Sequence, residues 1–162
     1  MEQHVVWPIF FALQESPLGH AMRLSPMLYP AVEILHILGF VVLVGSIIAL
    51  DLRLLGIGRS MAIPSLAGLL LPLSRFGFLL AISMGFLLFT ADAAHVVRNP
   101  AFQAKLLLIV LALVNVAAAH LGAWRQIDRW STDAPRGVRM TALLSLLLWL
   151  GVVCCGRLIA YF

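Results

Sequence analysis

Two histidines in apolar stretches of the chain each follow a carboxylate by three residues. Glu33 precedes His36, and Asp92 precedes His95. Three residues are close to one helical turn, so in a helix each carboxylate shares a face with its histidine. Ionisable side chains are costly in hydrocarbon, and those that occur there are candidates for a functional site. These two pairs are therefore the first places to look for chemistry.

Histidines on two different helices are the ligands that a b-type haem needs, one imidazole on each side of the iron. Gly39 lies one turn after His36 and would leave room for the porphyrin between helices. A carboxylate one turn away could orient the outer ring nitrogen of each histidine. The residues thus predict a haem b site formed by His36, His95 and Gly39.

Two other interpretations of the same residues stay open. Paired carboxylates and histidines are also typical of metal sites in helical bundles, which would make Glu33, His36, Asp92 and His95 the ligands of copper or another transition metal. The third interpretation is a structural or assembly subunit without a cofactor, in which each histidine only makes hydrogen bonds between helices.

The composition places these residues in a membrane. Of the 162 residues 62% are apolar and 11% are charged, and the mean hydropathy is +1.04. Four apolar blocks are long enough to span a bilayer, at about 30–55, 76–97, 101–123 and 140–162. The sequence therefore predicts an all-α, four-helix transmembrane bundle that forms one integral-membrane domain over residues 1–162.

The remaining apolar stretches are too short or too interrupted to span. Pro64 and Pro72 interrupt residues 61–73, which we expect to lie along the membrane interface. Residues 1–30 are expected to form an N-terminal interfacial segment. Because this segment lacks the pattern of a cleaved secretory signal, the first span is expected to act as the insertion signal.

The positive charges predict the orientation, since loops rich in Lys and Arg stay in the cytoplasm. One side of the predicted topology carries Arg53, Arg59, Arg75, Arg125, Arg129, Arg136 and Arg139, and the other carries Arg23, Arg98, Lys105 and Arg157. Both termini are thus predicted in the periplasm of a bacterial inner membrane. The basic balance fits anionic lipid, and no basic stripe with stacking aromatics indicates nucleic acid.

This topology predicts the depth of each polar residue at about 1.5 Å per residue. His36 would lie roughly 9 Å and His95 roughly 5 to 7 Å below the outer membrane surface, so the two are expected at one height. His120 would lie near the cytoplasmic side, where it could form a hydrogen bond across the bundle, with Asn115 nearby, or where the two residues could form a proton relay or part of a second site. Asp51 and Arg53 are expected to form an ion pair at the inner rim.

The chain resembles a family of small bacterial integral-membrane proteins of unknown function. The resemblance rests on Tyr29-Pro30-x-x-Glu33-x-x-His36-x-x-Gly39, Gly45-Ser46, Asp51-Leu52-Arg53-Leu54-Leu55-Gly56, Asn99-Pro100-x-Phe102-x-x-Lys105, Asn115, His120 and Gly156-Arg157-x-Ile159-Ala160-Tyr161. It implies the architecture and no activity. More remotely, the layout is similar to membrane cytochromes b and to copper-resistance membrane proteins. The two-haem cytochromes carry paired histidines at two depths, and this chain has such a pair at one depth only.

Few enzyme classes fit the sequence. It has no nucleophile elbow and no glycine-rich phosphate loop, and we expect a binding or electron-transfer protein. A redox partner or a quinone would then be needed, and small-residue spacings such as Gly77-x-x-x-Ala81 allow a homodimer or a larger membrane complex. The function that the residues favour most is electron transfer by one haem between His36 and His95 near the periplasmic side.

Overall fold

The computed structural model describes residues 7–122, 124, 127, 130 and 133–161. Its four long helices are α3 (Leu28–Leu54), α4 (Ile63–Ala91), α6 (Pro100–Leu121) and α7 (Arg136–Leu158), and α7 continues into the 3-10 turn η2 (Ile159–Tyr161). Each long helix is apolar enough to cross a membrane. The predicted all-α, four-helix bundle is confirmed. Positions 123 and 162, where two predicted spans end, and Arg125 and Arg129 lie outside the described residues.

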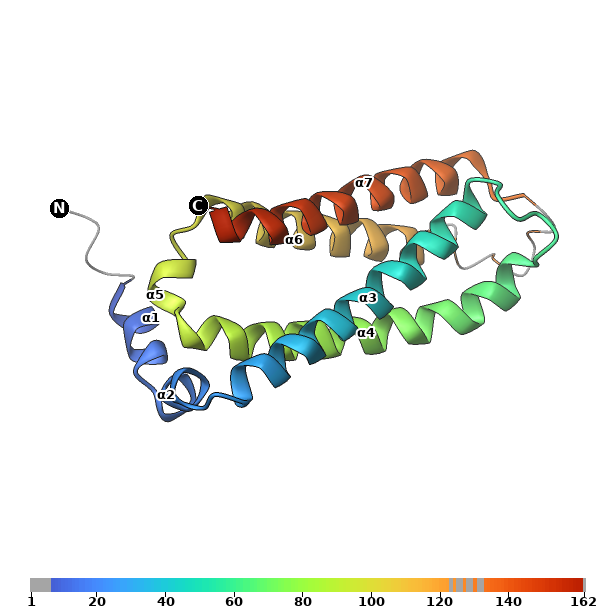
Figure 1. Ribbon diagram of the computed structural model, residues 1–162. Helices are drawn as coiled ribbons and strands as arrows, with labels where there is room; N and C mark the ends of the chain where they lie inside the picture. Colours follow the sequence, from blue (N-terminus) through green and yellow to red (C-terminus); the bar gives the residue numbers. More distant parts are fainter. Residues whose placement is uncertain (1–6, 123, 125–126, 128–129, 131–132, 162) are drawn as a thin grey trace.

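The bundle is elongated and has two distinct ends (Figure 1). At one end lie α1 (Trp7–Gln14), α2 (Pro17–Leu24) and the four-residue helix α5 (Ala93–Val96), together with the end of α7. We call this the α5 end. At the other, the loop end, α3 ends and α7 begins.

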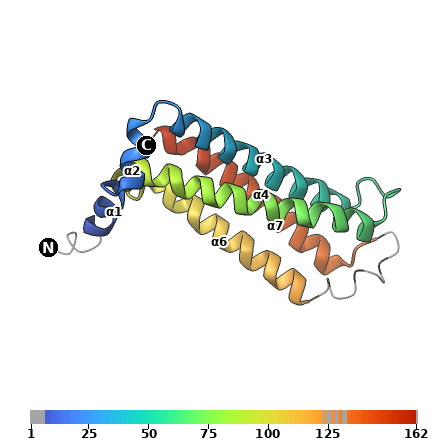
Figure 2. The same ribbon diagram turned by 90° about the horizontal axis from the view of Figure 1, so that it is seen from below.

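The long helices form two pairs. Helix α3 packs along α4, α6 packs along α7, and α3 also contacts α7. Glycine brings the first pair close, because a Cβ on Gly39 would lie 2.7 Å from the backbone nitrogen of Ala81 and one on Gly77 would lie 2.6 Å from that of Leu43. Seen from below, α6 lies beside α7, on the far side of the bundle from α3 (Figure 2). The two pairs are thus joined through α3 and α7.

The connection after α3 is organised by Arg53. This side chain is 2% exposed, and its Nε donates a hydrogen bond of 2.7 Å to the carbonyl oxygen of Met61. Gly56 and Gly58 have φ of +107° and +68°, a region that glycine enters without steric strain. The specific Asp-Leu-Arg-Leu-Leu-Gly element of the sequence therefore builds this turn.

Helix α4 differs from the sequence prediction in where it begins and in which residues belong to it. It begins at Ile63 instead of near residue 76, so residues 63–73 form its first turns and are not a separate interfacial segment. Pro64 falls in the first turn, where a missing backbone N–H is harmless, and Pro72 is accommodated inside the helix. The helix ends at Ala91, and Asp92 adopts φ −146° and ψ 49°, which breaks the helical path before α5.

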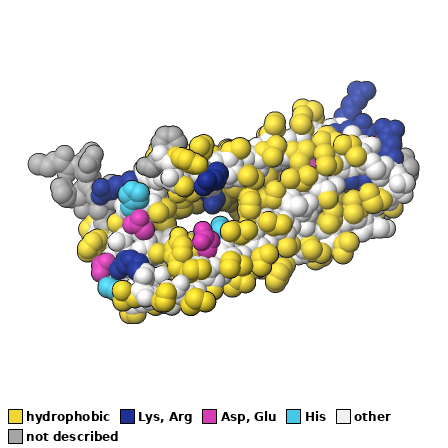
Figure 3. All heavy atoms as spheres, in the orientation of Figure 1, with side chains coloured by type: hydrophobic (Ala, Val, Ile, Leu, Met, Phe, Trp, Pro, Cys, Tyr) yellow, Lys and Arg dark blue, Asp and Glu magenta, His cyan; other side chains and the backbone are white. Residues whose placement is uncertain are grey.

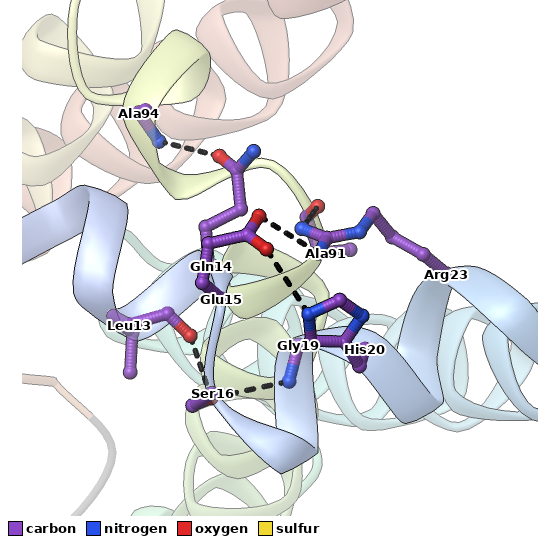
Figure 4. Close-up of polar contacts among 9 residues, drawn as sticks. All are labelled: Leu13, Gln14, Glu15, Ser16, Gly19, His20, Arg23, Ala91 and Ala94. Carbon is purple, nitrogen blue, oxygen red and sulfur yellow. Dashed lines mark hydrogen bonds and ion pairs between the residues drawn. The ribbon is translucent and has the colours of Figure 1, made fainter.

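The N-terminal helices satisfy backbone groups that this break exposes (Figure 4). The Gln14 side chain accepts a hydrogen bond of 3.1 Å from the backbone N–H of Ala94, at the start of α5. Arg23 donates to the carbonyl oxygen of Ala91 at 3.3 Å and pairs with Glu15 at 3.0 Å. Helices α1 and α2 are therefore fixed to the end of α4.

Asn99 joins α6 to the end of α7. Its Oδ1 accepts hydrogen bonds from the backbone N–H groups of Ala101 and Phe102, which caps the start of α6. Its Nδ2 donates to the carbonyl oxygen of Ile159 at 2.9 Å. The Asn99-Pro100 hairpin predicted from the sequence thus also holds the C-terminal turn in place.

Candidate functional site

His36 points from α3 onto α4. Its Nδ1 lies 2.8 Å from the carbonyl oxygen of Ala81. A carbonyl oxygen can only accept, so Nδ1 carries the proton and the neutral ring keeps a lone pair on Nε2. Gly85 provides the space, because a Cβ there would lie 2.9 Å from Cε1 of the imidazole. A histidine held by a backbone carbonyl in this way is oriented to bind a metal through its other nitrogen.

The charged side chains that act on His36 are Glu33, from the same helix, and Lys105, from α6. Lys105 is partly buried, and its Nζ lies 3.6 Å from where a Cβ on Gly156 of α7 would be. Figure 3 shows that the molecule is hollowed between the two helix pairs, with basic, acidic and histidine side chains around the opening. His36 and Lys105 thus belong to different helix pairs, and Lys105 is close enough to act electrostatically on the His36 imidazole.

Asp92 and His95 lie at the α5 end. The His95 side chain is 71% exposed, and its Nδ1 is 3.4 Å from Oδ2 of Asp92. The expected proximity of this carboxylate to its histidine is therefore present, although Asp92 lies at the break and only His95 lies in α5. An exposed pair of this kind contributes little to stability.

The structure places His36 and His95 at different heights, which corrects the expectation that they are level. His36 contacts Gly85, and α4 runs six residues past Gly85, about 9 Å, before the break that precedes His95. The expected depth of His95 assumed that the second span reaches residue 97. Since α4 ends at Ala91, His95 lies beyond the span.

The four proposed metal ligands do not form one group. Among the described residues, no three His, Cys, Asp or Glu side chains lie close enough to hold a metal ion. Glu33 and His36 are on α3, whereas Asp92 and His95 are at and after the end of α4. Gly39 does not widen the opening, because it is buried against the backbone of Ala81.

His120 and Asn115 have separate partners. His120 Nδ1 donates to the carbonyl oxygen of Val116 at 2.9 Å, and its ring stacks on Trp124 with 5.1 Å between centroids. Asn115 Nδ2 donates to the carbonyl oxygen of Thr141 and so joins α6 to α7. The hydrogen bond expected from His120 across the bundle is not the one observed, because His120 bonds within α6 and it is Asn115 that bonds to α7.

A buried polar cluster between α3 and α7 was missed by sequence reasoning. Asp51 is 7% exposed and accepts a hydrogen bond from Ser145, while its Oδ2 has no partner among the described residues. Trp149, one turn along α7, is 3% exposed with its Nε1 likewise unpartnered. The expected Asp51–Arg53 ion pair is wrong, because Arg53 turns away to the loop carbonyls. The feature of the sequence that could have indicated this cluster is Asp51 itself, an isolated carboxylate in an apolar block.

Comparisons with known proteins leave the activity of this arrangement open. Neither the curated proteins nor the solved structures provide a match to the chain. A family model described as "Family of unknown function (DUF6644)" matches residues 10–162. Because that match covers nearly the whole chain, the protein belongs to this family of unknown function.

Proposed function

We propose that the protein binds one b-type haem through His36 and transfers electrons in the membrane. The observation that carries this proposal is the fixed imidazole of His36. Its Nδ1 is held by the carbonyl oxygen of Ala81 at 2.8 Å, which leaves Nε2 as the nitrogen that can ligate iron.

The surroundings of His36 also support a bound group. An opening lies between the α3–α4 pair, which carries His36, and the α6–α7 pair, and a bilayer offers no water to fill such a space. A porphyrin is flat and apolar over most of its area. Lys105 would supply a cation that pairs with a haem propionate. A charged side chain at membrane depth is costly unless it has a partner of opposite charge.

His95 would be the second residue that holds the haem. Its exposed pair with Asp92 is a weak interaction, so the imidazole can leave it at little cost. Reaching an iron bound at His36 requires α5 to turn toward the opening, and this movement would break the hydrogen bond between Gln14 and Ala94. The proposal therefore includes a shift of α5 when haem binds.

The proposed orientation has both termini in the periplasm of a bacterial inner membrane. The described basic residues of the loop end support it: Arg53, Arg59, Arg75, Arg136 and Arg139. The haem would then lie in the periplasmic half. Alkaline phosphatase fused to the C-terminus should be active in this orientation, and activity of a fusion placed after Gly58 instead would contradict it.

Haem titration into the purified apoprotein tests the ligand assignment. We expect the wild type to give a Soret band that saturates at one haem per chain. His36→Ala should abolish it, and His95→Ala should convert a six-coordinate low-spin spectrum into a high-spin one. His20→Ala is the control, because His20 is exposed on α2 and pairs with Glu15. Equal haem binding by His36→Ala and the wild type would refute the proposal.

A further inference from the structure

A second recess lies at the loop end, away from the opening at His36. Its volume is about 430 Å³, and its walls are a stripe of α4 from Pro64 through Gly68 to Arg75, His120 of α6, and Trp124. The stripe positions are three or four residues apart, so they lie on one face of α4. The recess is therefore a groove bounded by α4 on one side and by the end of α6 on the other.

No side chain of the described residues fills the groove beside Gly68. A Cβ added at Gly68 would meet no atom within 4 Å. The main partner of α4 is α3, and the main partner of α6 is α7, so this face of α4 is left without a helix against it. The groove beside Gly68 is therefore open at the surface of the molecule.

The groove ends in a basic site. Arg75 is exposed, and none of the described residues that line the recess carries a carboxylate. His120 donates from Nδ1 to its own helix, which leaves Nε2 available to a ligand. Figure 3 shows that Lys and Arg side chains also gather at the loop end of the molecule. The charge of this site therefore favours an anion as its ligand.

The recess lies at the level in the membrane where lipid headgroups are found. Helix α6 has 22 residues and is about 33 Å long, close to the roughly 30 Å of a hydrocarbon core. His120 is near its last residue, and Arg75 lines the same recess. Arg75 comes twelve residues after the start of α4, so about 18 Å of α4 extends past this level. The basic site therefore lies at the membrane interface, with the first turns of α4 outside the hydrocarbon.

We propose that this recess binds one anionic phospholipid, with the phosphate on Arg75 and His120 and the rest of the polar headgroup in the groove beside Gly68. An arginine at the interface attracts anionic headgroups and fits a phosphate with two parallel hydrogen bonds. The partner is a specific lipid molecule of the leaflet that faces the loop end. This proposal does not depend on haem binding.

Thermal unfolding in detergent, with phosphatidylglycerol or phosphatidylcholine added, tests the site. We expect phosphatidylglycerol to raise the melting temperature of the wild type and phosphatidylcholine to leave it unchanged. Arg75→Gln should bind phosphatidylglycerol roughly fivefold more weakly, while Arg136→Gln, an exposed arginine at the same end, should match the wild type. The full-length chain is used in every case.

A second pair of variants tests the groove beside Gly68 without changing charge. Gly68→Leu should block the groove and remove the lipid effect, whereas Gly45→Leu should keep it, since both glycines are helical with open space at Cβ. The proposal is overturned if all four variants respond like the wild type, or if phosphatidylcholine stabilises as well as phosphatidylglycerol. Stabilisation by ubiquinone in place of phosphatidylglycerol also overturns it.

Discussion

At the scale of single residues, the three histidines of the bundle differ in what holds their Nδ1. The Nδ1 of His36 is held by a carbonyl of the neighbouring helix, that of His120 by its own helix, and that of His95 by an exposed carboxylate. A bond to another helix fixes the ring relative to the opening, which the other two bonds do not. His36 is therefore the residue on which the proposed haem site depends.

Gly85→Ala tests whether the position of this ring matters. The new Cβ would lie 2.9 Å from Cε1 of His36, so the imidazole must shift by a few tenths of an ångström. Because the imidazole can move while the backbone stays, we expect little loss of stability but about tenfold weaker haem binding, since ligand geometry is demanding. Calorimetric titration of haem measures the affinity, with Gly45→Ala as control. An unchanged affinity in Gly85→Ala would show that the ring is not a ligand.

The sequence identified His36 and Glu33 but not their surroundings. Spacing along one helix shows which side chains share a face, and this placed the two residues together. The carbonyl of Ala81 and the space at Gly85 belong to another helix, and no residue type in the sequence indicates that they lie beside His36. The expectation that His36 and His95 are level failed for the same reason, because the height of His95 depends on where α4 ends.

At the scale of the elements, the break at Asp92 decides the architecture of the α5 end. The sequence prediction placed the start of the second span too far along the chain, because prolines were expected to interrupt the helix. Pro64 and Pro72 both lie within α4. The consequence is that α4 ends at Ala91 and α5 forms a separate turn. Breakers in a membrane helix are tolerated where neighbours compensate, and this makes span limits hard to predict.

Gln14→Ala tests the attachment of α1 to this break. The backbone N–H of Ala94 would lose its acceptor, and we expect hydrogen exchange at the α5 amides to accelerate about tenfold because this end opens more easily. Exchange mass spectrometry in detergent measures the effect, with His20→Ala as the control at an exposed site. Equal protection in Gln14→Ala and wild type would contradict the proposed role of α1.

Gly77→Ala tests the close packing of α3 on α4. The added Cβ would lie 2.6 Å from the backbone nitrogen of Leu43, so the two helices must separate. We expect a loss of about 1 to 3 kcal/mol in the free energy of unfolding. Gly45→Ala, with open space at its Cβ, should show no loss. Chemical denaturation in mixed micelles compares the two, and equal stabilities would exclude this packing.

At the scale of the whole molecule, two helix pairs joined through α3 and α7 leave an opening with ionisable side chains on its walls. The number of spans was predictable, because 20-residue apolar blocks have few alternatives in a protein of this size. The division into pairs was not, since it follows from glycine contacts between helices. The opening is the feature that most needs a functional explanation, and a haem bound at His36 supplies one.

The reduced-minus-oxidised absorption spectrum of the protein, purified in mild detergent from haem-replete cells, tests this account most directly. We expect the α and Soret bands of a b-type haem at one haem per chain, both lost in His36→Ala. A folded wild-type protein without a Soret band, or a His36→Ala variant with the full spectrum, would contradict the account.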